Sequence, residues 1–311
     1  MNTVLAAYPP ALIDRLELYG SRDSWLAAFH RTEPTYSIGG TAAAGILLGD
    51  GWRVWSRAHE LDEDDGPRNV DALESGLWWE PHLIAWWGYK LLRGPVWSPL
   101  SRAVHPSYPW LRTSPDGFGT DSDRGVGLVE IKTRRSRAGW GKGEVMHEKA
   151  GAAVLSSMPP NVAIQCYGNL AASGLPYCDV VVAFGIRDIR RYRLLADESY
   201  QGWLVTQLDA WRTRHLVELH HPPLDPSVDC RDYLSRQERG TATREATDAE
   251  AVKAARYAVL GRALKAGKAE RSQLFAELAA AMGEIKTLTI RQQGKPGRFT
   301  NVGKFGKTSN L

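Results

Sequence analysis

Two carboxylates and a lysine lie near the middle of the chain in a pattern suited to phosphoryl chemistry. Asp116 lies in the turn sequence Ser-Pro-Asp-Gly, and Glu130 and Lys132 follow in a segment where charged and apolar residues alternate. Side chains two residues apart on a strand point to the same face, so Glu130 and Lys132 are expected side by side, with Asp116 across a hairpin. Carboxylate oxygens bind hard divalent cations, and such cations promote phosphodiester hydrolysis.

An ordinary surface hairpin with one Glu–Lys pair would contain the same residues, so other segments must distinguish the two interpretations. Glu80 lies on the apolar stripe of a helix predicted over residues 71–92, between Leu77 and Ile84. A carboxylate on a buried helix face is costly unless it is paired in a salt bridge or ligates a metal. The helix alone leaves both explanations open.

Polar and basic side chains follow these carboxylates along the chain. Gln165 lies on a helix predicted over residues 161–173, directly after two prolines. A basic segment rich in small residues follows Lys132 and is expected to contact a phosphate backbone. Its cations are Arg134, Arg135, Arg137 and Lys142.

The sequence Ile-Gly-Gly-Thr-Ala-Ala-Ala, which begins at Ile38, is a second candidate for phosphate binding. Gly39 and Gly40 leave backbone N–H groups accessible at the start of a predicted small-residue helix, and Arg31 lies a short distance before them. Close packing of a Gly/Ala helix explains the same residues, so both interpretations stay open.

Helical and extended segments together define the expected fold. Helices are predicted over residues 11–31 (with a break at Tyr19–Gly20), 71–92, 161–173 and 198–219, and a buried strand over 178–184. This order predicts an α/β (α+β) fold in which helices flank a mixed central sheet. A proline-rich boundary separates a domain over residues 1–225 from a C-terminal extension over 226–311. The extension is predicted to form a helical hairpin, broken near Gly267, and a basic β-hairpin.

Composition limits the class of protein. With 311 residues, of which 43% are hydrophobic, the chain can bury a sizeable core. Neither an apolar run of membrane-spanning length nor a secretory signal is apparent, so a cytoplasmic protein without a membrane partner is expected. The three cysteines form no Cys-x-x-Cys pair, which disfavours a zinc or four-cysteine iron–sulfur site.

Positive charge is concentrated at the C-terminus. Residues 285–311 contain six basic and no acidic residues, whereas the whole chain has a net charge of +4. Either an anionic polymer binds this tail or the tail serves solubility, and charge alone does not separate the two.

Four motifs, in this order, resemble those of the PD-(D/E)xK nucleases, specifically the YqaJ-type viral recombinases related to lambda exonuclease. The similar segments are Ile38-Gly-Gly-Thr, Gly76-Leu-Trp-Trp-Glu80, Ser114-Pro-Asp116-Gly with Glu130-Ile-Lys132, and the Gln165 helix with the strand Asp179-Val-Val-Val. The resemblance covers about residues 25–195. It implies a restriction-endonuclease-like core and metal-dependent hydrolysis of DNA.

The resemblance also implies a role for each matching residue in the metal site. Asp116, Glu130, Glu80 and the backbone carbonyl of Ile131 would hold one or two Mg²⁺ or Mn²⁺ ions. Lys132 would position or deprotonate the attacking water. These five residues are the expected catalytic and metal-binding set, together with Gln165, which would organise the site.

At the substrate end, the resemblance implies a pocket for a terminal 5′-phosphate. Arg31 and the turn formed by Gly39, Gly40 and Thr41 would receive that phosphate. Thr41 stands at a position where the family usually has serine, followed here by alanine rather than an acidic residue.

The family's activity is the digestion of one strand of a DNA duplex from a free end, with 5′→3′ direction, in phage-type recombination and DNA end resection. By resemblance we expect a bacterial or phage-encoded exonuclease that forms a homo-oligomeric ring, such as a trimer, with a single-strand annealing protein as partner. Two alternatives remain: a structure- or sequence-specific endonuclease on the same fold, and a non-catalytic DNA-binding module.

Overall fold

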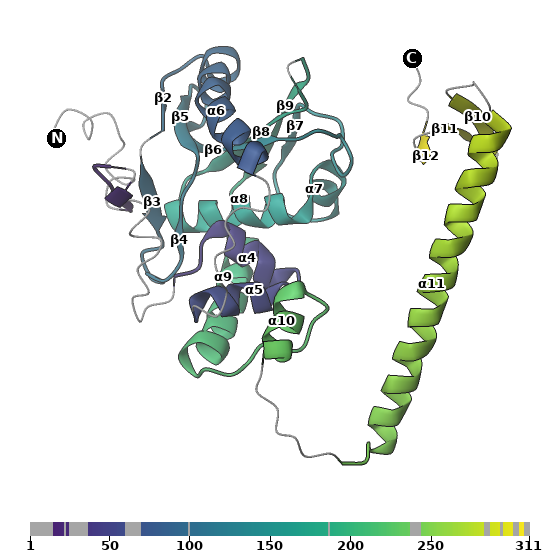
Figure 1. Ribbon diagram of the computed structural model, residues 1–311. Coiled ribbons are helices and arrows are strands. Elements are labelled where there is room, and N and C mark those ends of the chain that lie inside the picture. Colours follow the sequence, from purple (N-terminus) through teal and green to yellow (C-terminus); the bar gives the residue numbers. More distant parts are fainter. Residues whose placement is uncertain are drawn as a thin grey trace. The chain divides into compact units, whose positions relative to one another are not determined.

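The computed structural model describes the chain in two compact units, residues Met1–Gln237 and Glu238–Leu311 (Figure 1). The described residues are 15–21, 23–24, 37–59, 70–98, 100–185, 187–236, 244–282, 287–292, 295–300 and 305–307. Arg31 lies outside these ranges, whereas the Ile38-Gly-Gly-Thr motif lies within them.

A six-stranded mixed sheet with strand order β2-β5-β6-β8-β9-β7 forms the centre of the first unit. Its strands are β2 (Val96–Trp97), β5 (Gly117–Asp121), β6 (Gly125–Thr133), β7 (Val145–His147), β8 (Tyr177–Ala183) and β9 (Ile189–Leu195). β5 and β6 form the predicted antiparallel hairpin, with Gly117 opposite Val129. β6 and β8 run parallel, which requires a crossover, and helix α8 (Pro160–Ser173) supplies it.

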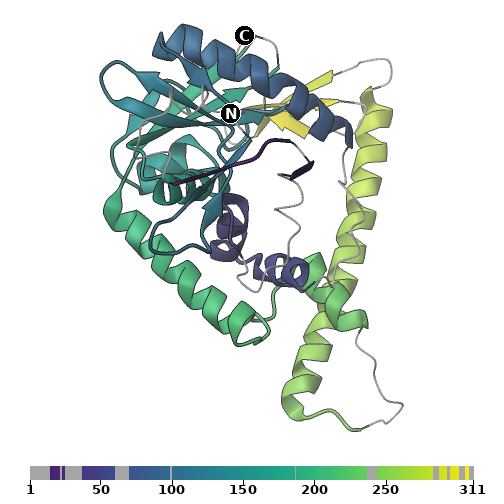
Figure 2. The same ribbon diagram turned by 90° about the vertical axis from the view of Figure 1, so that its left-hand side faces the viewer.

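Helices cover both faces of this sheet, as predicted. Helix α6 (Val70–Trp87), continued by the π-helical turn η1 (Gly88–Leu92), lies across one face, and α8 lies on the other (Figures 1 and 2). Among the described residues, this unit also contains α4 (Gly40–Leu47), α5 (Gly51–Ala58), α7 (Ala152–Ser157), α9 (Glu198–Arg212) with η2 (Thr213–Val217), and α10 (Val228–Arg236). A second, antiparallel sheet contains β1 (Leu16–Leu18), β3 (Ser101–Val104) and β4 (Arg112–Thr113).

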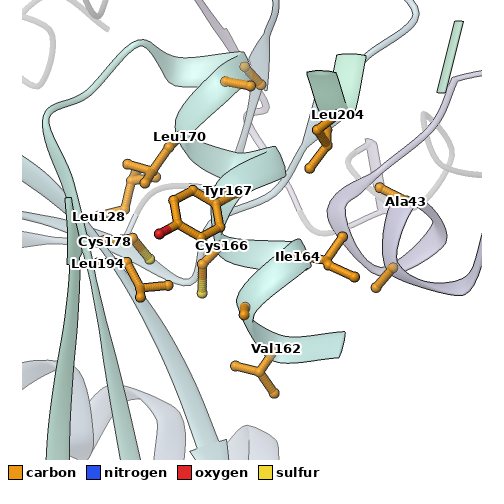
Figure 3. Close-up of a cluster of buried hydrophobic side chains, with 14 of the residues drawn as sticks. Ala43, Leu128, Val162, Ile164, Cys166, Tyr167, Leu170, Cys178, Leu194 and Leu204 are labelled. Atoms are coloured by element: carbon orange, nitrogen blue, oxygen red, sulfur yellow. The ribbon is translucent and has the colours of Figure 1, made fainter. Parts of the chain in front are cut away.

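Alternation along β6 divides its side chains between two cores. Val129 and Ile131 belong to the cluster beneath α6, which includes Leu83, Ile84 and Trp87. Leu128 belongs to the larger cluster beneath α8, where Cys166, Tyr167 and Leu170 face Leu128, Cys178 and Leu194 (Figure 3). Each of these large apolar side chains contributes about 1.5–3 kcal/mol on burial, so both helices are held firmly to the strand that carries Glu130.

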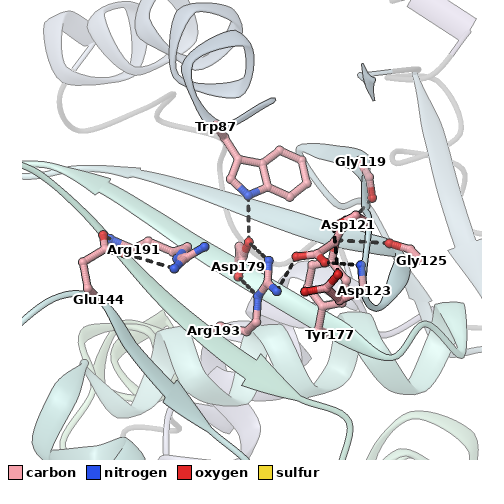
Figure 4. Close-up of polar contacts among 11 residues, drawn as sticks. Trp87, Gly119, Asp121, Asp123, Gly125, Glu144, Tyr177, Asp179, Arg191 and Arg193 are labelled. Atoms are coloured by element: carbon pink, nitrogen blue, oxygen red, sulfur yellow. Dashed lines mark hydrogen bonds and ion pairs between the residues drawn. The ribbon is translucent and has the colours of Figure 1, made fainter. Parts of the chain in front are cut away.

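A buried ion pair connects α6 to the sheet (Figure 4). The Arg193 guanidinium binds both carboxylate oxygens of Asp179, through Nε at 2.7 Å and Nη2 at 2.7 Å. The indole Nε1 of Trp87 donates to Asp179 Oδ2 at 2.8 Å, and Arg193 Nη1 reaches Asp121 Oδ2 at 2.6 Å. One cation therefore fixes β5, β8, β9 and the C-terminal end of α6 in a single network.

Three elements differ from the sequence-based expectation. A strand, β1, lies where a helix over residues 11–31 is predicted, because Leu16–Leu18 pairs with β3 some 85 residues later in the chain, from Leu16 opposite Ala103. In α6 the predicted apolar stripe is wrong at its start, since Leu77 is 40% and Trp78 is 62% exposed and the buried face begins at Leu83. Residues 226–236, assigned to the C-terminal extension, lie in the first unit because Cys230 and Tyr233 of α10 pack against Trp52 and Trp55.

The second unit contains one long helix and a small sheet. Helix α11 (Asp248–Met282) is continuous, so the predicted break near Gly267 is wrong; a glycine on an exposed helix costs only about 1 kcal/mol. The predicted basic β-hairpin is confirmed as β10 (Thr287–Gln292) and β11 (Lys295–Thr300), and β12 (Phe305–Lys307) pairs with β11. Among the described residues, none of the helices is long and apolar enough to cross a membrane.

The buried pair predicts a large difference between two amide substitutions. Asp179→Asn is expected to lower the free energy of unfolding by about 3 kcal/mol, because the buried Arg193 cation loses most of its counter-charge. Glu144→Gln is the matched control, since Glu144 pairs with Arg191 at 3.1 Å with 56% of its side chain exposed and is expected to contribute less than about 1 kcal/mol. Urea denaturation followed by circular dichroism measures both, and equal losses would contradict the assigned role of the pair.

Candidate active site

Glu130 is the most deeply buried carboxylate of the candidate site, with 1% of the residue exposed. It lies near the C-terminal end of β6, on the face covered by α8. Lys132 Nζ donates to Glu130 Oε1, and Gln165 Nε2 donates to the same oxygen at 2.7 Å. Asn169 Nδ2 donates to Glu130 Oε2 at 3.2 Å. A buried charge requires such partners, and here one strand and one helix supply them.

Lys132 is held between two side chains rather than projecting into solvent. Its ammonium contacts Glu130 and donates to Gln165 Oε1 at 3.2 Å, and its side chain is 17% exposed. Burial alone would lower the pKa of Lys132, but the Glu130 and Asp116 carboxylates outweigh burial and the pKa is raised. In this state Lys132 is therefore a cation, which suits positioning of a phosphate or water.

Asp116 approaches the site from the neighbouring strand, in the turn before β5. Its Oδ2 accepts a hydrogen bond of 2.6 Å from the backbone N–H of Ile131, and its carbonyl accepts one of 2.8 Å from the Ser98 hydroxyl. Gly117 permits this turn, because a Cβ there would lie 3.0 Å from the Trp97 carbonyl oxygen. Asp116 thus lies across the hairpin from Glu130, as the sequence predicts.

Burial raises the pKa of the Asp116 carboxyl well above its usual range, and repulsion from Glu130 and Glu80 raises it further. Glu80 lies on α6 and is half-buried, and its negative charge disfavours ionisation of Asp116. Glu80 of α6 and Glu130 of β6 therefore both act electrostatically on Asp116 in the turn before β5, although the three do not converge as a ligand set among the described residues.

A glycine on α4 supports the residues that hold Glu130. A Cβ at Gly40 would lie 2.8 Å from Asn169 Oδ1 and 3.0 Å from Gln165 Cγ, so α4 packs on α8 at the two amide side chains of the site. Gly40 is buried, Gly39 is half-buried and Thr41 is exposed. Close packing thus explains Gly40, while the predicted 5′-phosphate role of Gly39, Gly40 and Thr41 stays a prediction.

The predicted basic segment lies at the surface beyond Lys132. Arg134, Arg135, Arg137 and Lys142 are all exposed. Arg137 Nε pairs with Asp188 Oδ2 at 2.6 Å, with 63% of the arginine side chain exposed. An exposed pair of this kind is worth less than about 1 kcal/mol, so a phosphate can exchange for Asp188.

Asn169 is predicted from the sequence to share a helix face with Gln165 but is given no role there, and the structure shows that it donates a hydrogen bond to Glu130. It lies one turn after Gln165 on α8, a spacing that places both on one helix face. That spacing was a usable signal, but nothing in the sequence shows that the shared face points at Glu130.

The donor set fits a divalent cation. Among the described residues, no group of three His, Cys, Asp or Glu side chains already converges as a ligand set, and the Lys132 ammonium is the counter-ion of Glu130. However, burial and then repulsion from Glu130 and Glu80 raise the pKa of Asp116 despite the Lys132 ammonium. Hard oxygen ligands with excess negative charge are what Mg²⁺ and Mn²⁺ prefer.

Comparisons with known proteins give distant structural similarity only. No protein-family model and no curated protein matches the chain. Two crystal structures of the alkaline exonuclease LHK-Exo from Laribacter hongkongensis, one in complex with dAMP, are 17% identical to it, with TM-scores of 0.48 and 0.47. Each match covers 69% of this chain and 96% of LHK-Exo. A structure of SSO0001 follows at 10% identity and a TM-score of 0.33, covering 64% of this chain and 88% of its own.

Both LHK-Exo structures are exonucleases by name, the activity class that the motifs predict. At TM-scores below 0.5 this overlap carries no argument about the chain, so its function is inferred from the site residues.

Two alanine substitutions on α4 test whether α4 packs against the amide side chains that hold Glu130. Gly40→Ala is expected to lower the free energy of unfolding by about 1–3 kcal/mol, because the new Cβ pushes against Asn169 and Gln165. Gly45→Ala is the matched control, since its Cβ would meet nothing closer than 3.7 Å, and it is expected to raise the free energy of unfolding by about 0.5–1 kcal/mol. Denaturant titrations that give changes of opposite sign in the free energy of unfolding for the two variants confirm the contact. No change for Gly40→Ala would contradict it.

Proposed function

We propose that this chain hydrolyses DNA phosphodiester bonds with a divalent metal ion, acting on free duplex ends. The observation that supports the proposal best is the Glu130 site, where a buried carboxylate, a lysine cation and two amides lie beside Asp116. A Glu130–Lys132 salt bridge that served only stability would not need two further acidic groups, Asp116 and Glu80, near it. Repulsion among acidic groups is expected of a site that binds a cation and then a phosphate.

Each residue has a task in this proposal. Asp116, Glu130, Glu80 and the Ile131 carbonyl would hold Mg²⁺ or Mn²⁺, as one ion or two. When bound, the ion would neutralise the charge that develops on the phosphate and assist the ionisation of water. Lys132 is placed to orient the attacking water or a nonbridging phosphate oxygen, since its ammonium is fixed by Glu130 and Gln165.

The reaction is a displacement at phosphorus. Water adds to the phosphorus atom, one P–O ester bond breaks, and the leaving oxygen takes up a proton. Gln165 and Asn169 contribute indirectly, because their amides hold the Glu130 carboxylate in place as charge shifts.

The finer parts of the proposal rest on the order of the four motifs. They are 5′→3′ direction, a role in phage-type recombination, a homo-oligomeric ring, a single-strand annealing partner and a cytoplasmic location. Arg31, together with Gly39, Gly40 and Thr41, is proposed to receive the 5′-phosphate.

Digestion of end-labelled linear duplex tests the activity. Glu130→Gln and Lys132→Ala are each expected to reduce the rate by at least about a hundredfold, because each removes charge from the reacting centre. Glu144→Gln, which removes a carboxylate far from the site in the fold, is expected to retain the wild-type rate.

A covalently closed plasmid separates exonuclease from endonuclease. The proposal expects the linear form to be digested and the closed circle to survive. If the circle is cut as fast as the linear form, the chain is an endonuclease; if no variant changes any function, it is a DNA-binding module.

Metal binding has its own readout in thermal unfolding. Millimolar MgCl₂ is expected to raise the melting temperature of the wild type and not that of Asp116→Asn, because only the folded wild-type site binds the ion. Without metal, Asp116→Asn is expected to melt above the wild type, since it removes a repelled, buried charge.

Asp123→Asn is the control, because Asp123 is an exposed residue in the β5–β6 turn. It should show the wild-type response to MgCl₂. An equal response in all three proteins would place the metal elsewhere.

A further inference from the structure

A cleft of about 410 Å³ lies where α6 crosses the ends of β6 and β8. Ser75 and Trp79 of α6 form one wall, and Arg134 and Arg135 form another after the end of β6. Thr133, which alternates with Lys132 and so lies on the α6 face of the sheet, is also part of the lining. The cleft is therefore separate from the Glu130 side of β6, and its size is that of a small-molecule site.

The cleft adjoins the catalytic residues through the same two elements. Trp79 directly precedes Glu80 on α6, and Arg134 follows Lys132 by two residues at the end of β6. A Cβ at Gly76 would lie 3.9 Å from Thr133 Oγ1, which places this turn of α6 against the strand end. Trp79 and Arg134 thus connect the cleft, along the chain, to Glu80 and Lys132.

Aromatic surface is available on the α6 side. Trp79 is half-buried and lines the cleft, and its ring contacts Trp78 at a centroid distance of 5.0 Å. Trp78 is 62% exposed and also contacts His82 at 4.9 Å. An exposed group of aromatic rings beside a cleft is typical of platforms on which unpaired bases stack.

Cationic groups are available on the opposite side. Arg134 and Arg135 are exposed, and among the ion pairs of the described residues neither one has an acidic partner. Arg134 uses one N–H to reach the Thr133 carbonyl at 2.8 Å and keeps the others available. Asp71 also lines the cleft, so its lining carries two positive charges against one negative charge.

We propose that this cleft binds one nucleotide of a single DNA strand, next to the nucleotide at the catalytic carboxylates. The base stacks on Trp79, and Arg134 and Arg135 bind the adjoining phosphate, with the Ser75 hydroxyl in reach of the same nucleotide. The inference rests on the proposed function, because a nuclease must hold a strand beside the bond that it cuts. It favours single-stranded over duplex DNA, since a base must be unpaired to enter the cleft.

Binding of fluorescein-labelled oligo-dT, measured by fluorescence anisotropy in EDTA, tests the cleft without digestion. Trp79→Leu is expected to weaken binding about five- to a hundredfold, the range seen when one stacked base is lost. Arg135→Ala is expected to weaken binding and to reduce the slope of log affinity against log salt by about one. The wild-type preference for oligo-dT over an abasic oligomer of the same length should vanish in Trp79→Leu.

Two controls match these variants in chemistry but not in place. Trp203→Leu removes an exposed tryptophan of α9, and Arg124→Ala removes an exposed arginine of the β5–β6 turn. Both are expected to bind as the wild type does. Arg135 is exposed, so its variant tests the cleft even if Trp79→Leu unfolds.

The outcomes separate this inference from the proposed function. Wild-type affinity in Trp79→Leu and Arg135→Ala, in a protein that digests DNA, would overturn the cleft alone. Weakened binding in both variants of a protein that digests no DNA would overturn the nuclease and retain the cleft as a strand-binding site.

Discussion

The burial of the Glu130 carboxylate is the constraint on which the rest of the site depends. A carboxyl group that is 1% exposed needs hydrogen-bond partners inside the protein, and Glu130 has them in Lys132, Gln165 and Asn169. These contacts tie β6 to α8, and the absence of a side chain at Gly40 lets α4 support α8 from behind. Hydrogen bonds to Glu130, as well as apolar packing, therefore determine where α8 lies on this side of the sheet, and α4 packs against α8.

Contacts on the other face of the sheet hold α6, the helix that carries Glu80, in position near Asp116. The Asp179–Arg193 pair and the Trp87 indole fix the end of α6, while Leu83 and Ile84 pack on the sheet beneath it. With the helix fixed at one end, its earlier turns carry Glu80 toward Asp116 and Trp79 toward the cleft. The Asp179–Arg193 pair thus fixes the helix whose Glu80 acts on the charge of Asp116.

Local pattern was enough to predict the hairpin, the shared face of Glu130 and Lys132, and helix α8, because alternation and helical period report directly on which side a residue faces. Prediction from local pattern failed where contacts between segments far apart in the chain determine the structure. Leu16–Leu18 forms a strand only because β3 pairs with it. Asn169 donates a hydrogen bond to Glu130 only because α8 crosses the face of the sheet on which Glu130 lies. The cleft beside Trp79 needs three segments to meet, so no single stretch of sequence indicates it.

The central claim is that water displaces an ester oxygen at a phosphorus atom held by the Glu130 site. The most direct measurement is digestion of a short duplex in H₂¹⁸O with MgCl₂, followed by mass spectrometry of the released nucleotides. Hydrolysis at this site predicts one ¹⁸O atom in the phosphate for each bond broken by the wild type, and no labelled product from Glu130→Gln. Labelled product from both proteins, or none from the wild type, would contradict it.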